Sequence, residues 1–144
     1  MASAAELASG RTLAMPERAA LFLGARLPTP GKKSRGQPDP QAELAQQERR
    51  CRDYAAATGY QVAAVFREVL PELPESRPEL KRLRTAMWHR AFDVVVAASP
   101  DRLYIDPDRV ARFLWEARVL GLRVEFLEVP DPYVWVVKEY GWPL

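Results

Sequence analysis

The sequence predicts an α/β fold in three layers, a mostly parallel four-stranded sheet with helices on both faces. Short apolar runs alternate with longer amphipathic segments along the whole chain. The segments between successive apolar runs are long enough to hold crossover helices, and such crossovers give parallel strands with helices on both sides of the sheet. A chain of 144 residues, 48% of them hydrophobic, is long enough to bury one core. We therefore expect one domain of this class.

The four expected strands differ in how apolar they are. Residues 19–25 and 93–98 are nearly continuous apolar runs, as is typical of strands buried on both faces. The other two strands are expected at residues 61–66 and 123–129. The order strand, helix, strand, helix, strand, helix, strand then accounts for the chain between residues 19 and 129.

The three expected helices are marked by capping signals at their ends. Asp39 and Pro40 begin the first and Gly59 ends it, Ser76 and Glu79 form a capping box for the second, and Asp106 and Pro107 begin the third, which Gly121 ends. Along the first helix, Leu44, Cys51 and Tyr54 fall on one face, which we expect to be buried.

Arginines follow the expected strands. The loops at residues 26–39, 67–76 and 99–106 leave the carboxyl ends of three strands, where parallel sheets bind their ligands. These loops carry Arg26, Arg67, Arg77 and Arg102. We expect any functional site at this edge of the sheet.

A series of short motifs carries a family resemblance. In chain order they are Gln47 with Tyr54-Ala55 and Gly59, Val65-Phe66-Arg67-Glu68, Arg77-Pro78-Glu79-Leu80, Phe92-Asp93-Val94-Val95-Val96, Asp101-Arg102-Leu103 and Gly121-Leu122-Arg123-Val124. Through them, residues 21–129 resemble the catalytic domain of the serine recombinases, the resolvase/invertase family. The resemblance implies a resolvase-like fold and a role related to DNA recombination, as in mobile elements.

The same resemblance implies that the active site is degenerate. In this family a serine after the first strand attacks a DNA phosphate, and arginines hold that phosphate. The family pattern Tyr-x-Arg-x-Ser reads Phe22-Leu23-Gly24-Ala25-Arg26, so Gly24 replaces an arginine and Arg26 the nucleophile. Ile105 replaces the second arginine of Asp-Arg-Leu-x-Arg, while the family-like Arg77, Asp101 and Arg102 are retained.

A guanidinium cannot attack phosphorus, so we assign no catalytic residue and expect no cleavage by the family mechanism. One alternative is an active recombinase or nuclease with a relocated nucleophile, Ser34, in the loop after the first strand. Another is a purely structural module for protein interaction.

Basic residues give the expected binding sites. Arg26, Arg77 and Arg102 form an anion site for a phosphate, or instead pair with Glu68, Asp101 and Asp106. Asp101 and Arg102 are alternatively a salt-bridged turn that holds the helix start. In the loop after the first strand, Lys32, Lys33 and Arg35 follow a DNA backbone, or else form a solvated loop. DNA bound through its phosphates is the expected partner.

The rest of the composition excludes several classes. The single cysteine, Cys51, is expected to be a buried, inert thiol, and the single histidine, His89, to lie at a helix end, so we expect no metal or other cofactor. No apolar run is long enough to span a bilayer and the N-terminus lacks a signal core, so we expect no membrane association and a cytoplasmic location.

The expected division is a loose arm at residues 1–18, the resolvase-like domain at 19–130 and an apolar C-terminal cap at 131–144. The last segment is too short for the recognition helix or zinc ribbon that follows in the family. Its aromatic side chains either cover the sheet or form a patch for a protein partner or a second copy of the chain. The net charge of +2 argues neither for nor against a nucleic-acid partner.

Overall fold

The computed structural model describes residues 15–26, 39–70 and 77–141. Its elements are β1 (Arg18–Arg26), α1 (Pro40–Thr58), β2 (Gln61–Leu70), α2 (Pro78–Trp88), β3 (Val94–Ala97), the 3₁₀ turn η2 (Pro100–Arg102), α3 (Pro107–Val119), β4 (Arg123–Phe126) and α4 (Asp131–Tyr140). The strands form one sheet in the order β2-β1-β3-β4, and all neighbouring strands are parallel. The expected α/β fold is confirmed.

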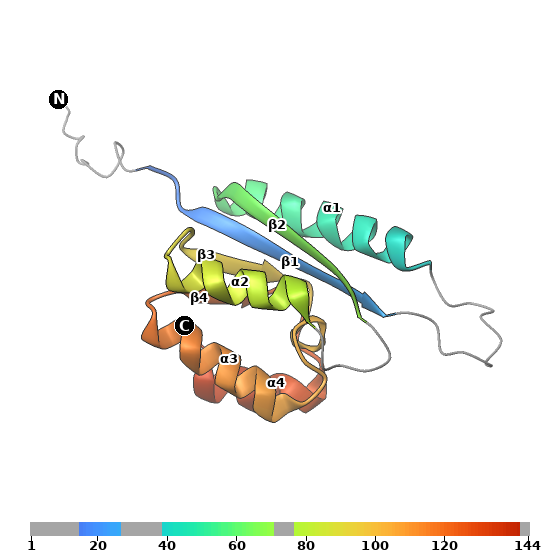
Figure 1. Ribbon diagram of the computed structural model, residues 1–144, viewed down its shortest axis with the longest axis vertical. Coiled ribbons are helices and arrows are strands. Elements are labelled where there is room, and N and C mark those ends of the chain that lie inside the picture. Colours follow the sequence, from blue (N-terminus) through green and yellow to red (C-terminus); the bar gives the residue numbers. More distant parts are fainter. Residues whose placement is uncertain (1–14, 27–38, 71–76, 142–144) are drawn as a thin grey trace.

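Helices cover both faces of this sheet. In Figure 1, α1 lies on one face, and α2, α3 and α4 lie on the other. The side chains of the central strand β1 alternate between the two cores: Leu21 packs with Leu44 of α1, and Phe22 packs with Leu83 of α2. Residues 19–23 of β1 are completely buried. Burial on both faces explains why this strand is a continuous apolar run.

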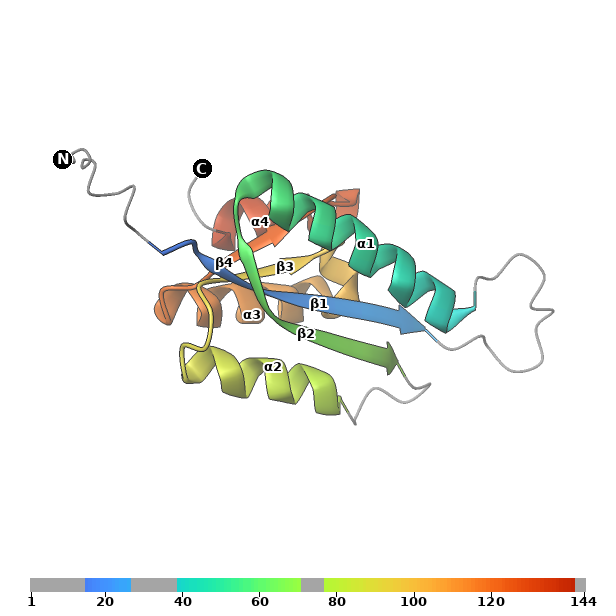
Figure 2. The same cartoon turned by 90° about the horizontal axis from the view of Figure 1, so that it is seen from above.

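The strands end at different heights. β3 ends at Ala97, opposite Phe22 of β1, whereas β2 follows β1 to the pair of Arg26 and Leu70. β1 therefore extends past β3 with a partner on one side only. The carboxyl ends of β1 and β2 lie at the edge where α1 begins (Figure 2).

Two strands differ in length from the sequence prediction. β2 was expected to stop at residue 66, yet residues 67–70 continue it because β1 extends alongside and pairs with them. β4 was expected to reach residue 129 and ends at Phe126, because its partner β3 ends at Ala97, opposite that residue.

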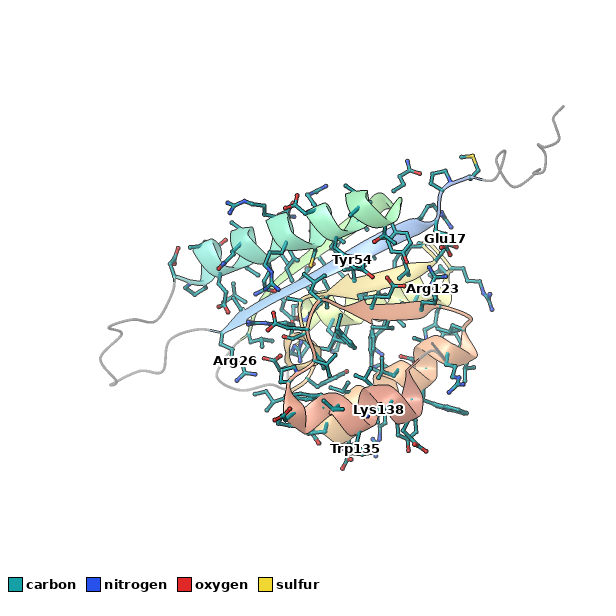
Figure 3. The ribbon with its side chains drawn as sticks, turned by 180° about the vertical axis from the view of Figure 1, so that it is seen from behind. Glu17, Arg26, Tyr54, Arg123, Trp135 and Lys138 are labelled. Carbon is teal, nitrogen blue, oxygen red and sulfur yellow. The ribbon has the colours of Figure 1, made fainter. Side chains whose placement is uncertain are left out.

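Side-chain hydrogen bonds connect the residue before β1, Glu17, to β4. Arg18, expected in a loose arm, is the first residue of β1, and residues 1–14 lie outside the described residues. Both carboxylate oxygens of Glu17 accept hydrogen bonds from the Arg123 guanidinium, each at 2.7 Å. Beside them, the Tyr54 hydroxyl donates to Glu125 at 2.6 Å. Figure 3 shows Glu17, Tyr54 and Arg123 together at this end of the sheet.

Residues 131–140 form a helix, α4, which the prolines and glycine of this segment had not suggested. Pro132 lies in its first turn, where a missing N–H costs nothing, and Gly141 follows its last residue. Tyr133 and Val136 are buried in the core on the α3 side of the sheet. Trp135 is 51% exposed and points away from that core (Figure 3).

The helix ends follow the expected signals in part. Gly59 ends α1 at a φ of 89°, which suits glycine, and the Asp106 carboxylate accepts the N–H of Asp108 at the start of α3. Asp39 precedes α1 as expected, but its side chain makes no capping hydrogen bond. Ser76, half of the expected capping box, lies outside the described residues.

Within the described part of the chain, no helix is long and apolar enough to cross a membrane. No cluster of metal-ligating side chains occurs among the same residues.

Candidate functional site at the carboxyl edge of the sheet

Gln47 of α1 takes the place of a strand beside the end of β1. Where β3 has stopped, the Gly24 N–H donates to Gln47 Oε1 at 3.1 Å, and Gln47 Nε2 donates to the Gly24 carbonyl at 2.8 Å. A carboxamide carries one acceptor and two donors, so it can satisfy both backbone groups as a neighbouring peptide would. Gln47 is buried, and these two bonds fix α1 against the site.

Arg102 contacts the same glycine as Gln47 does. Its Nη1 donates to the Gly24 carbonyl at 3.2 Å and to Glu43 Oε2 at 2.8 Å. A Cβ atom on residue 24 would lie 3.0 Å from the Arg102 carbonyl oxygen, tighter than ordinary contacts. Glycine at this position therefore allows the turn after β3 to approach β1.

Arg77 forms a buried ion pair with Glu68 of β2. Arg77 Nε donates to Glu68 Oε1 at 2.5 Å, and the two side chains are 11% and 3% exposed. The other oxygen, Oε2, accepts the backbone N–H groups of Glu79 and Leu80. Glu68 thus caps α2 from another element, where its negative charge also favours the helix dipole.

The charges at this edge largely cancel. Glu68 neutralises Arg77 and Glu43 neutralises Arg102. Arg77 Nη2 and Arg102 Nε are buried without a hydrogen-bond partner in the described part of the chain. Two guanidinium groups therefore keep N–H donors unused although their charges are paired.

Arg26 lies at the exposed end of β1, far from Glu17 and Arg123 at the other end of the sheet (Figure 3). Its positive charge acts on Tyr133, whose pKa is raised mainly by burial, further raised by Asp101 and partly lowered by Arg26. The Tyr133 hydroxyl donates to the Ile105 carbonyl at 2.6 Å, while the Ile105 side chain is exposed. The start of α4 is thereby joined to this edge.

Of the ion pairs considered from the sequence, one forms and another is replaced by a different pair. Arg77 does pair with Glu68, as one alternative held. Arg102 pairs with Glu43 rather than with its neighbour Asp101, because Arg102 reaches across β1 to α1. Asp101 instead accepts the Ser99 hydroxyl at 2.5 Å, which closes the turn after β3.

Arg67 was expected from the sequence to lie at this edge, but it does not. It lies inside β2 because that strand continues to Leu70, and its guanidinium donates to Glu48 of α1 at 2.7 Å. Hydrogen bonds from Arg52, then from Arg67, lower the pKa of Glu48.

The remaining candidates from the sequence are Cys51, His89 and residues 32–35. Cys51 is buried, and burial raises the pKa of its thiol to about 11, so it is a weak nucleophile at neutral pH. His89 caps the carboxyl end of α2 and is exposed. Lys32, Lys33, Ser34 and Arg35 lie outside the described residues.

Two residues of the site, Gln47 and Glu43, were not recognised as such from the sequence. Gln47 lies on the buried face of α1 with Leu44 and Cys51, and a polar residue on an apolar face is a signal that could have identified it. Glu43 offers no comparable signal, because its partner Arg102 is distant in the chain.

A parallel β2-β1-β3-β4 sheet with helices on both faces defines an open α/β domain, and its arginines lie at the carboxyl edge, where such sheets bind ligands. The chain belongs to the family described as resolvase, N-terminal domain, whose model matches residues 26–133. The match begins at the last residue of β1. No curated protein matches the sequence.

Solved structures share this fold. The C-terminal catalytic domain of ISC1926 TnpA, an IS607-like serine recombinase, aligns with a TM-score of 0.62 and 21% identity over 85% of this chain and 76% of that one. The N-terminal catalytic domain of TP901-1 integrase gives 0.61 and 22% over 77% and 78%. A resolvase family site-specific recombinase from Streptococcus pneumoniae gives 0.59 and 14% over 75% and 70%.

Proposed function

We propose that this chain is a serine-recombinase-type domain that does not cleave DNA through a phosphoserine and acts by binding. The observation that carries this proposal is the close approach of Gly24 and Arg102. In the family pattern, residue 24 is an arginine of the phosphate site and residue 26 is the nucleophile. Here residue 26 is an arginine, and even a Cβ on residue 24 would crowd the Arg102 carbonyl.

The retained arginines support the same proposal. Stabilising the transition state requires cations that are already positioned where negative charge develops on the phosphate. The charge of Arg77 is offset by Glu68 and that of Arg102 by Glu43, while residue 105 is an exposed isoleucine. A phosphate cage that lacks two arginines, at residues 24 and 105, and has two neutralised ones would stabilise that charge poorly.

DNA phosphates are the ligand we assign to the basic residues that remain. These are Arg26, Lys32, Lys33, Arg35, Arg77 and Arg102. Arg26 ends β1, and Lys32, Lys33 and Arg35 follow it in the sequence without an intervening acidic residue. A run of this kind binds a nucleic-acid backbone without reading its sequence.

Catalytic silence is tested by incubating the full chain with supercoiled DNA and trapping covalent adducts under denaturing conditions. We expect no adduct and no nicked product. An adduct would overturn the proposal, and its loss in Ser34→Ala would identify the relocated nucleophile.

Phosphate binding is tested by measuring affinity for duplex DNA at about 50 and about 200 mM salt, where the steepness reports the number of phosphates neutralised. A variant with glutamine at positions 26, 32, 33 and 35 should bind more weakly and depend less on salt. The control replaces Arg49, Arg50, Arg82 and Arg118, four exposed arginines on helices, with glutamine. Equal losses in both variants would contradict a specific role for the β1 end.

A protein-binding module is the second candidate, favoured by exposed tryptophans on the helical face opposite α1. Trp88 is 59% exposed, Trp115 57% and Trp135 51%. Absence of DNA binding even at low salt would favour this candidate over the first.

A further inference from the structure

A second basic site lies on the outer surface of the domain, away from Gly24 and Gln47. It is a pocket of about 340 Å³. Its lining residues come from α2, α3 and the turn before α3, and are Arg84, Tyr104, Arg109, Arg112, Phe113 and Glu116. Both helices cover the face of the sheet opposite α1 (Figure 1).

The one acidic residue of the lining is already occupied. Arg84 donates to both carboxylate oxygens of Glu116, at 2.9 and 3.0 Å, and Trp88 Nε1 donates to the second of them at 3.0 Å. The hydrogen bond from Arg84 is the main cause that lowers the pKa of Glu116, so this carboxylate stays ionised at neutral pH. Glu116 therefore holds Arg84 in the pocket wall.

The remaining two arginines are not balanced. Arg109 and Arg112 are exposed, and neither forms an ion pair with another described residue. They are three residues apart on α3, a spacing that brings side chains together and makes like charges repel. The lining carries three arginines against one glutamate, an excess of two positive charges that an anion between Arg109 and Arg112 would relieve.

The other lining residues suit more than a bare ion. Tyr104 supplies a hydroxyl and an aromatic ring, and Phe113 adds apolar surface. The volume falls near the lower end of the range for small-molecule sites. An arginine can bind a phosphate through two parallel N–H donors, and aromatic side chains pack against planar rings.

We propose that this pocket binds a phosphate monoester of mononucleotide size, with the phosphate between Arg109 and Arg112. Tyr104 also connects it to the edge of the sheet, because the Arg77 guanidinium lies 5.5 Å from the centre of its ring. The lining includes none of the residues that the proposed function assigns to DNA phosphates, and Arg77, which contacts Tyr104, is the one described residue of that set beside it.

The test is a calorimetric titration of the full chain with adenosine monophosphate, inorganic phosphate and adenosine. We expect saturable binding of the nucleotide, weaker binding of phosphate and none of adenosine. In Arg109→Gln/Arg112→Gln, the nucleotide affinity should fall at least about tenfold, as expected for the loss of charge-assisted hydrogen bonds. The matched control Arg49→Gln/Arg52→Gln removes two charges at the same spacing from α1 and should bind like the wild type.

Equal nucleotide affinity in the two double variants, or equal binding of adenosine and the nucleotide, would overturn the proposal. Circular dichroism and thermal unfolding establish that each variant is folded. Duplex DNA, titrated in parallel, separates two sources of the phosphate: a loss confined to the nucleotide indicates a free monoester, and a loss for both indicates a DNA phosphate. The glutamine variant at positions 26, 32, 33 and 35 should retain nucleotide binding even if its DNA binding is lost.

Discussion

The carboxamide of Gln47 forms two hydrogen bonds with the backbone of Gly24, one to the carbonyl and one from the N–H. The two residues belong to different elements, α1 and β1, and meet where the neighbouring strand β3 has already ended. One buried side chain thus completes the hydrogen bonding of a strand and fixes the position of a helix.

Gln47→Leu should destabilise the domain by about 1–3 kcal/mol, because it leaves the buried Gly24 N–H without a partner and the Gly24 carbonyl with the Arg102 guanidinium alone. Gln46→Leu makes the same change at an exposed position of the same helix and should alter the free energy of unfolding by no more than about 0.5 kcal/mol. Urea unfolding followed by circular dichroism measures both. Similar values for the two variants would mean that the Gly24 backbone groups find other partners.

Arg77→Met should cost about 3 kcal/mol or more, because it leaves the buried Glu68 carboxylate without its cation. The comparison is Arg82→Met, which removes an exposed ion pair with Glu79 on the same helix and should cost less than about 1 kcal/mol. The difference in unfolding free energy between these variants measures the effect of burial. A small difference would show that the backbone N–H groups of residues 79 and 80 suffice for Glu68.

Gly24→Ala should destabilise the domain by about 1–2 kcal/mol, because its methyl group would crowd the Arg102 carbonyl at 3.0 Å. Without this contact the sign would be opposite, since alanine in a strand is favoured over glycine by about 0.5–1 kcal/mol. Thermal and urea unfolding give the sign directly. A more stable Gly24→Ala variant would remove the steric basis for the silent site.

Alkaline pH should weaken the fold through Tyr54. The hydrogen bond to Glu125, followed by burial, raises the pKa of Tyr54 to about 12 from its ordinary value of 10. The folded state therefore holds this proton more tightly than the unfolded state, so the stabilisation is complete below pH 10 and is lost as the pH rises towards 12.

The measurement is the free energy of unfolding between neutral pH and about pH 12, with phenolate absorbance recorded in parallel. Tyr54→Phe should be less stable at neutral pH and show a shallower decline above pH 10. Tyr140→Phe, a control at a tyrosine without a carboxylate hydrogen bond among the described residues, should keep the decline of the wild type. An unchanged decline in Tyr54→Phe would contradict the assignment.

The resolvase-like fold could be predicted because its signals are local. Apolar runs such as residues 19–25, the start at Asp106 and the glycine ends at Gly59 and Gly121 act over a few residues, and parallel crossovers then restrict the topology. The buried positions of Cys51 and Leu44 follow from helical periodicity in the same way. The predicted strand lengths were less accurate than the predicted fold, because the length of β2 depends on how far β1 extends beside it.

The helix α4 shows a limit of reading prolines as breaks. Pro132 interrupts a helix only in its interior, and in the first turn it is compatible with one. The apolar spacing of Tyr133 and Val136 was present in the sequence, but it became interpretable only with α3 alongside to bury them.

The sequence alone determined which side chains are available at the carboxyl edge: an arginine at residue 26, a glycine at 24 and an isoleucine at 105. The tertiary structure decided how they are used. Arg102 meets Glu43 and Arg77 meets Glu68 because α1, β2, the start of α2 and the turn after β3 converge there. Ion pairing acts over a few ångströms of space, whatever the separation in the chain. Residue types are fixed by the order of the chain, whereas the cancellation of their charges depends on packing between segments far apart in it.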